Sequence, residues 1–146
     1  MIEFNLNDDD DDDHEFATED HYVIYLSVED LLYLVEAQGT TVADVGLLAS
    51  AAARPQTSVA GQDAYESLQE KAAALAESIC RNHPLVDGNK RLTIGAIRIF
   101  LKVNGYELDL DEDARFDLIM AIADGTLRGV PAIANRMPIT PRRNPL

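Results

Sequence analysis

The chain has 146 residues and 47% apolar residues, enough for one folded domain with a real core. Its formal net charge is −14, and residues 1–20 account for most of it, with ten carboxylates and no Lys or Arg. The remaining residues carry 16 acidic and 12 basic side chains, and no basic stretch stands out among them, which disfavours a DNA partner. One cysteine, Cys80, excludes an internal disulfide, and no apolar run could span a membrane or act as a signal peptide, so we expect a cytoplasmic protein.

The two ends of the chain differ from its middle. Residues 1–20 include six consecutive aspartates, Asp8–Asp13, whose mutual repulsion predicts a disordered acidic arm. The arm is either a solvated tail or a segment that docks on a basic partner or weakly binds divalent ions. Residues 138–146 contain three prolines and are expected to form a loose tail, which leaves residues 21–137 as the folded domain.

Hydrophobic periodicity predicts an all-α domain. Tyr22–Leu26 favours an extended lead-in, and Ser27 with Asp30 predicts a capped helix that ends at Gly39. Five further helices are expected at residues 44–53, 66–82, 89–104, 113–123 and 130–137. The helix over 66–82 is rich in alanine, which lets a neighbouring helix approach closely, so we expect it at the centre. In the helix over 113–123, the apolar positions are Phe116, Ile119, Met120 and Ala123.

One stretch, residues 83–91, gathers chemical groups, and it reads His-Pro-Leu-Val-Asp-Gly-Asn-Lys-Arg. A glycine-containing turn that opens a helix exposes unpaired backbone N–H groups, and the helix dipole adds positive charge, so such a bend suits phosphate. Lys90 and Arg91 add full charges. Asp87 can hold a magnesium ion shared with phosphate oxygens, and His83 can accept a hydroxyl proton near neutral pH. Each signal alone also fits an ordinary turn with solvated charges.

This motif resembles the signature of the Fic/Doc family, and its Asn-Lys-Arg ending resembles the death-on-curing (Doc) toxin branch. The resemblance extends over roughly residues 22–130 through four flanking segments, which are Gly46-Leu47-Leu48, Ala53-Arg54-Pro55-Gln56, Glu70–Leu75 and Asn104-Gly105-Tyr106. It implies a compact Fic-like helical bundle, in which a central helix-loop-helix carries the motif. It also implies that the polar connector over residues 55–64, by composition a loop or an irregular hairpin, contains a short flap.

The resemblance implies a role for each motif position. His83 would be the catalytic general base toward a Ser, Thr or Tyr hydroxyl of a target protein. Asp87 would bind Mg²⁺ that bridges the phosphates of ATP. The implied phosphate-binding residues are Gly88, Asn89, Lys90 and Arg91. The implied flap residues, which would align the target polypeptide by strand-like pairing, are Ser58, Val59, Ala60 and Gly61.

Departures from the family pattern bear on the reaction. The adenylylating branch has Gly where this chain has Lys90 and Arg where it has Ile94. A lysine crowds the place of an inner phosphate, and without a second arginine the α-phosphate lacks a partner, so we expect transfer of the γ-phosphoryl group. The Doc branch with this lysine phosphorylates an elongation factor and halts translation. Arg98 lies two turns after Arg91 and is not an equivalent replacement. Leu85 stands where the family has Phe and is expected to be a smaller core plug.

The family's self-inhibitory pattern, Ser or Thr followed four residues later by Glu and then Gly or Asn, does not occur in the sequence. The resemblance therefore implies restraint by a separate antitoxin protein. The sequence as a whole predicts the toxin of a toxin–antitoxin system, a magnesium-dependent kinase that uses ATP to modify a translation factor. The alternatives are a Fic-type adenylyltransferase and a catalytically silent binding module with the same fold.

Overall fold

A computed structural model describes residues 22–143, so the predicted acidic arm lies outside the described residues. The described residues are mostly helical, which confirms the predicted helical fold. The helices are α2 (Val28–Ala37), α3 (Val45–Ala53), α4 (Leu68–Asn82), α5 (Asn89–Val103), α6 (Glu112–Asp124) and α7 (Val130–Ala134), with a 3₁₀ turn at Arg54–Gln56. The strands are β1 (Ser58–Val59), β2 (Gln62–Asp63), β3 (Tyr106–Leu108) and β4 (Ile139–Pro141).

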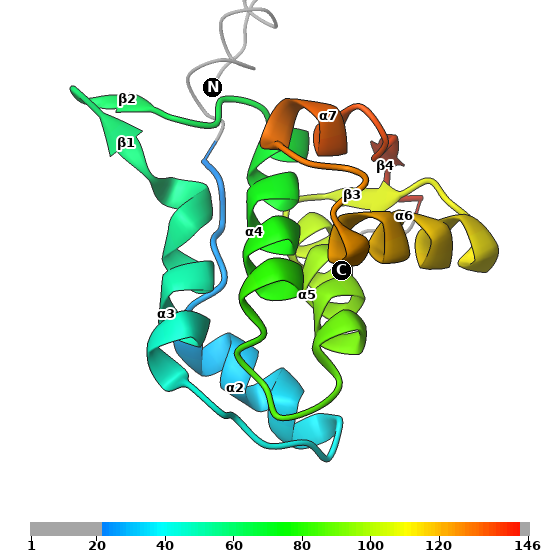
Figure 1. The fold of residues 1–146 in the computed structure, drawn as a ribbon. Coiled ribbons are helices and arrows are strands. Elements are labelled where there is room, and N and C mark those ends of the chain that lie inside the picture. The colour runs from blue at the N-terminus through cyan, green and yellow to red at the C-terminus, as the bar shows by residue number, and fades with distance from the viewer. Residues whose placement is uncertain (1–21, 144–146) are drawn as a thin grey trace, which may run out of the picture.

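Helix α4 is the centre of the fold, as its alanine content predicts (Figure 1). It contacts α3, α5, α6 and α7, and nine of its 15 residues are buried. Small side chains on most of its faces let these helices approach closely, while Leu75 and Ile79 supply larger apolar contacts. The bend after α4 therefore begins from a rigid support.

Side-chain caps fix where the helices begin. Ser27 and Asp30 form the predicted capping box of α2. A second box, Ser67 with Glu70, starts α4 at Leu68, two residues later than the periodicity indicates. Asp111 likewise accepts the Ala114 N–H at the start of α6. The observed helices start within two residues of the predicted positions.

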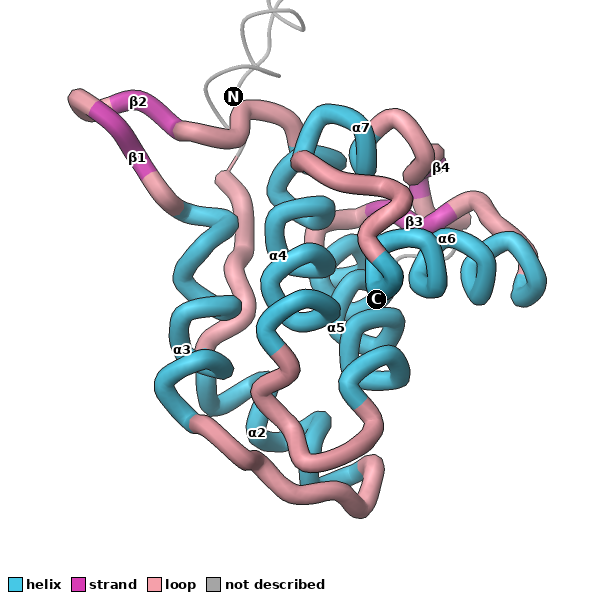
Figure 2. Tube along the Cα trace, viewed as in Figure 1, coloured by secondary structure: helices cyan, strands magenta, loops and turns pink. Residues whose placement is uncertain are grey.

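The C-terminal segment differs from its prediction. Ile139–Pro141 is not loose but forms β4, which lies beside β3 (Figure 2). The two strands pair antiparallel in the register Leu108–Ile139 and Tyr106–Pro141. Pro141 is tolerated because it lies on a strand with a free edge. The lead-in over residues 22–26 is extended as predicted, and its Ile24 backbone exchanges hydrogen bonds of 2.8 and 2.9 Å with the Asn104 side chain.

Helix α6 buries only part of its predicted apolar set. Leu118, Ile119 and Ile122 are buried, whereas Phe116 is 62% exposed and Met120 is 36% exposed. Of the four apolar positions of the predicted helix, Ile119 is buried and Ala123 packs against the core, whereas Phe116 and Met120 are turned outward. Within residues 22–143, no helix is both long and apolar enough to cross a membrane.

Candidate functional site

The motif forms the bend between α4 and α5, at the lower end of α4 in Figure 1. His83 is the C-cap of α4 and adopts a left-handed conformation, with φ 52° and ψ 63°, while its N–H donates to the Ile79 carbonyl at 3.2 Å. A non-glycine residue with positive φ is uncommon, and such strain persists only where surrounding structure fixes it. The His83 side chain is exposed, so the bend presents an imidazole to solvent.

Asn89 closes the bend from inside. Its side-chain oxygen accepts the Leu85 N–H at 2.9 Å, and its amide nitrogen donates to the Leu85 carbonyl at 3.1 Å. Leu85 is 3% exposed, so it plugs the core as predicted. The Asn89 side chain is therefore committed to holding the bend, and any contact from Asn89 to phosphate is left to its backbone N–H.

A second segment, residues 40–44, clamps the outer side of the bend. The Thr40 hydroxyl donates to the Asp87 carbonyl at 2.6 Å, and the Val86 N–H donates to the Thr41 carbonyl at 2.9 Å. The Pro84 carbonyl accepts two N–H groups, from Ala43 and Asp44. No local sequence signal identified this clamp, because the two segments lie about 45 residues apart in the chain. It fixes the strained backbone around His83.

The N-terminus of α5 has no side-chain cap. Helices α2, α3, α4 and α6 each have a Ser or Asp N-cap whose side chain accepts a backbone N–H, whereas the N-cap of α5 is Gly88, which has φ 86° and no side chain to accept one. The first N–H groups of α5 therefore point outward without an internal acceptor. Lys90 and Arg91 are exposed immediately beside them, and so is Asp87. This arrangement binds anions through backbone dipoles and two fixed cations.

Lys90 and Arg91 continue into a groove between α5 and α6. A cavity of about 360 Å³ there is lined by Lys90, Arg91, Ile94 and Arg98 from α5 and by residues of α6. Arg98 thus shares one pocket with the two motif cations, as its spacing of two helical turns indicates. Ile94, which replaces an arginine of the adenylylating pattern, supplies apolar surface between them.

The predicted flap residues form a hairpin, in which Ser58 pairs with Asp63 and Val59 with Gln62, around a turn at Ala60 and Gly61. The hairpin projects from the end of the bundle opposite to the motif bend, so the structure does not bring it beside His83 (Figure 1). A polar cavity of about 390 Å³ lies between the two sites, and its lining includes Thr57, just before β1, and Asn82, just before His83.

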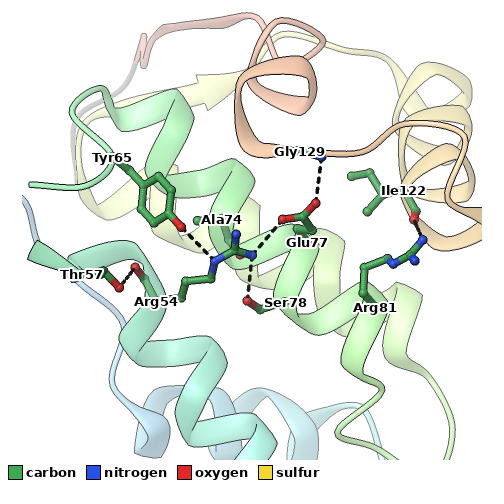
Figure 3. Close-up of polar contacts among 9 residues, drawn as sticks. All are labelled: Arg54, Thr57, Tyr65, Ala74, Glu77, Ser78, Arg81, Ile122 and Gly129. Atoms are coloured by element: carbon green, nitrogen blue, oxygen red, sulfur yellow. Dashed lines mark hydrogen bonds and ion pairs between the residues drawn. The ribbon is translucent and has the colours of Figure 1, made fainter. Parts of the chain in front are cut away.

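Arg54 holds the base of the hairpin against α4 (Figure 3). Its guanidinium donates to Tyr65 Oη at 3.1 Å, to Glu77 Oε1 at 2.9 Å and to Ser78 Oγ at 3.2 Å. Burial opposes the Arg54 charge, but Tyr65 and Glu77 outweigh this effect and raise the Arg54 pKa. The other Glu77 oxygen accepts the Gly129 N–H at 2.9 Å, so one carboxylate joins three separate segments.

The comparisons with known proteins agree with this site. A sequence profile described as Fic/DOC family matches residues 14–101, more than half of the chain, and includes the whole motif. The chain belongs to the Fic/DOC family. A protein named Toxin Doc from Mycolicibacterium smegmatis (strain ATCC 700084 / mc(2)155) is 52% identical over 84 residues, which are 56% of this chain. The chain spans 65% of that relative's length. Both findings confirm the predicted resemblance to the Fic/Doc family and its Doc branch.

The donor set at the Fic/DOC motif fits a magnesium ion delivered with phosphate. Asp87 is an exposed carboxylate, and within residues 22–143 no cluster of three or more His, Cys, Asp or Glu side chains could hold a metal alone. Magnesium commonly takes one or two carboxylates and completes its shell with phosphate oxygens and water. Cys80, in contrast, is 1% exposed and its burial raises the thiol pKa, so it is a core residue as predicted.

Proposed function

We propose that this chain is a protein-modifying toxin that transfers the γ-phosphoryl group of ATP to a hydroxyl of a target protein. The observation that carries the proposal is the bend at residues 83–89. It presents an imidazole, a carboxylate and the bare N-terminus of α5, and two exposed cations follow directly. The match to the Fic/DOC family and the similarity to Toxin Doc support it.

In the proposed reaction, His83 accepts the proton of the target hydroxyl. The hydroxyl oxygen then forms a bond to the γ-phosphorus, the bond from that phosphorus to the β,γ-bridging oxygen breaks, and ADP leaves. Asp87 would hold a magnesium ion, which neutralises phosphate charge when bound. The N–H groups of Gly88 and Asn89, with Lys90 and Arg91, would hold the phosphate oxygens; such preorganised donors stabilise charge that develops in the transition state.

The preference for phosphorylation over adenylylation rests on Lys90 and Ile94. Lys90 brings a long side chain to the first turn of α5, where the adenylylating pattern has glycine, and Ile94 gives the α-phosphate no cation. Adenylylation would require that α-phosphate to react. We also propose that the target is a translation factor and that a separate antitoxin restrains the toxin, in line with the Doc branch.

The hairpin at residues 58–63 is proposed to align the target polypeptide, with the polar cavity between Thr57 and Asn82 as the path from hairpin to His83. Because the hairpin stands away from the motif bend, the target segment would have to extend along α3 and α4. Ser50 lines this path and offers an exposed hydroxyl group to its backbone.

The deciding experiment incubates the protein with magnesium and either α- or γ-labelled ATP in cell extract. A target labelled only from the γ position supports a kinase, and labelling from the α position overturns that choice in favour of adenylylation. The matched inactive variant is His83→Asn, because asparagine tolerates the left-handed conformation observed at this position. Loss of a general base is expected to reduce labelling about 10²–10⁴-fold. If His83→Asn arrests cell growth as strongly as the unmodified chain, the protein is a binding module.

A further inference from the structure

The groove between α5 and α6 concentrates positive charge in an otherwise acidic protein. Four cations line it, Lys90, Arg91, Arg98 and Arg115, against a single carboxylate from Glu112. Within residues 22–143 the structure has two ion pairs, and both lie on other parts of the fold. The adjoining hollow beyond Arg98 has four basic residues against three carboxylates, so the excess of positive charge is larger in this groove.

The floor of the same groove is apolar. Phe116 and Met120 are exposed there, and Ile94 and Ile119 lie beside them. An exposed aromatic ring surrounded by cations is typical of a surface that another segment covers. The complementary occupant carries several carboxylates together with apolar side chains.

Residues 1–20 of this chain have that composition. They hold ten carboxylates and no Lys or Arg, and the Asp8–Asp13 tract lies between apolar residues at Leu6 and Phe16. The other acidic run, residues 107–113, has five carboxylates, but it belongs to β3, the following turn and the start of α6 and is already part of the fold. Charge complementarity therefore favours this segment over any other part of the same molecule.

The arm also starts close enough to reach the groove. The hydrogen bonds between Ile24 and Asn104 fix the lead-in at the C-terminal end of α5. From Asn104, the helix rise places Arg98 about 9 Å away and Lys90 about 21 Å away along α5. Asp13 precedes Tyr22 by nine residues, which span up to about 30 Å when extended. Ile99 lines the hollow beside Ile24 and also the hollow beside Arg98, so the path between them is continuous.

We propose that the acidic arm, residues 1–20, docks in the α5–α6 groove of its own chain, with its aspartates on the four cations and an apolar side chain against Phe116. Docking of this kind covers Lys90 and Arg91 at the edge of the motif. Where the proposed function also holds, the arm competes with the phosphates of ATP and acts as a built-in restraint on the enzyme.

The test uses the full chain with a nitroxide spin label at Asp10→Cys, since Cys80 is buried and does not take the label. In the absence of nucleotide, we expect the nearby label to cause loss of NMR amide intensity at Arg98, Arg115 and Phe116, and not on α2. The intensity should return in 1 M salt, where the Debye length falls to about 3 Å. It should also return in the variant Arg98→Glu.

Two controls make the result specific. Arg136→Glu reverses an equally exposed charge away from the groove and should leave the intensity loss intact. Replacing the other five aspartates of the Asp8–Asp13 tract with asparagine in the labelled chain, which leaves residues 22–143 untouched, should abolish the salt-sensitive part of the loss. Undiminished amide intensity on α5 and α6 would overturn the proposal. So would intensity loss seen only when labelled chains are mixed with separate ¹⁵N-enriched chains, because the arm would then bind a second copy.

The competition with ATP has its own measurement. Titration with Mg-ATP should displace the arm and restore the amide intensity, and the Asp-to-Asn variant should bind Mg-ATP several-fold more tightly than the unmodified chain. Equal affinity in the two proteins would overturn the competition. Because docking is measured without nucleotide, its failure is distinct from a failure of the proposed function, which Mg-ATP binding to the Asp-to-Asn variant tests separately.

Discussion

Replacing Glu77 with alanine should destabilise the fold far more than removal of an ordinary surface carboxylate. In the folded chain, one Glu77 oxygen pairs with Arg54 at 2.9 Å and the other accepts the Gly129 N–H at 2.9 Å. The Glu77 side chain is only 18% exposed and the Arg54 side chain 31%, so water can replace the lost partners only in part. Glu77→Ala therefore leaves a partly buried guanidinium with one acceptor fewer and a backbone N–H without one.

The expected cost follows from these two losses. A hydrogen bond to a charged group contributes about 1.5–3 kcal/mol, and an unsatisfied buried N–H costs about 1–3 kcal/mol. Partial exposure of Arg54 lowers the first value, so we expect the free energy of unfolding to fall by about 3 kcal/mol. For a chain of this size, each kcal/mol corresponds to roughly 3 °C, which gives a decrease in Tm of about 9 °C.

Urea and thermal unfolding, followed by circular dichroism, measure this change. Glu77→Gln keeps an acceptor for the Gly129 N–H but removes the charge. Its free energy of unfolding should therefore lie between those of Glu77→Ala and the unmodified chain. Glu36→Ala, which removes an exposed carboxylate on α2, is the matched control and should stay within about 0.5 kcal/mol. A Glu77→Ala variant as stable as this control would refute the idea that the carboxylate joins Arg54 to the α7 segment.

Three further changes test other parts of the structure. Gly88→Ala should destabilise the fold by about 1–2 kcal/mol in urea, because φ is 86° at this position; an unchanged midpoint would show that the turn relaxes without strain. Cys80 should resist a thiol reagent in the folded protein and react fully in denaturant, because burial raises its pKa; rapid reaction without denaturant would contradict its buried position. Hydrogen bonds from the Thr126 backbone and hydroxyl lower the Asp124 pKa. These bonds therefore stabilise the fold at pH values above the ordinary pKa of aspartate, and their contribution is lost as the pH falls through the lowered pKa. Thr126→Ala keeps the backbone bond and should raise the Asp124 pKa part of the way in an NMR titration; an unchanged value would assign the effect to the backbone alone.

Local patterns of side chains were enough to predict the features that depend on neighbouring residues. Ser27 with Asp30 fixed the start of α2, the alanine run marked α4 as the central helix, and Gly105 ended α5. The motif between α4 and α5 also pointed to the bend, its exposed N–H groups and the Fic/DOC family. Caps, periodicity and a contiguous motif all act within a few residues, so they can be identified before the chain folds.

The packing of the folded chain determines which distant segments meet. It paired β4 with β3, clamped the motif bend with residues 40–44, and joined Arg54, Glu77 and Gly129. It also turned Phe116 outward and gathered scattered cations into one groove, although the charge count of the chain indicated no basic face. These contacts link residues dozens of positions apart, and they depend on how the helices pack, which no local pattern of side chains encodes.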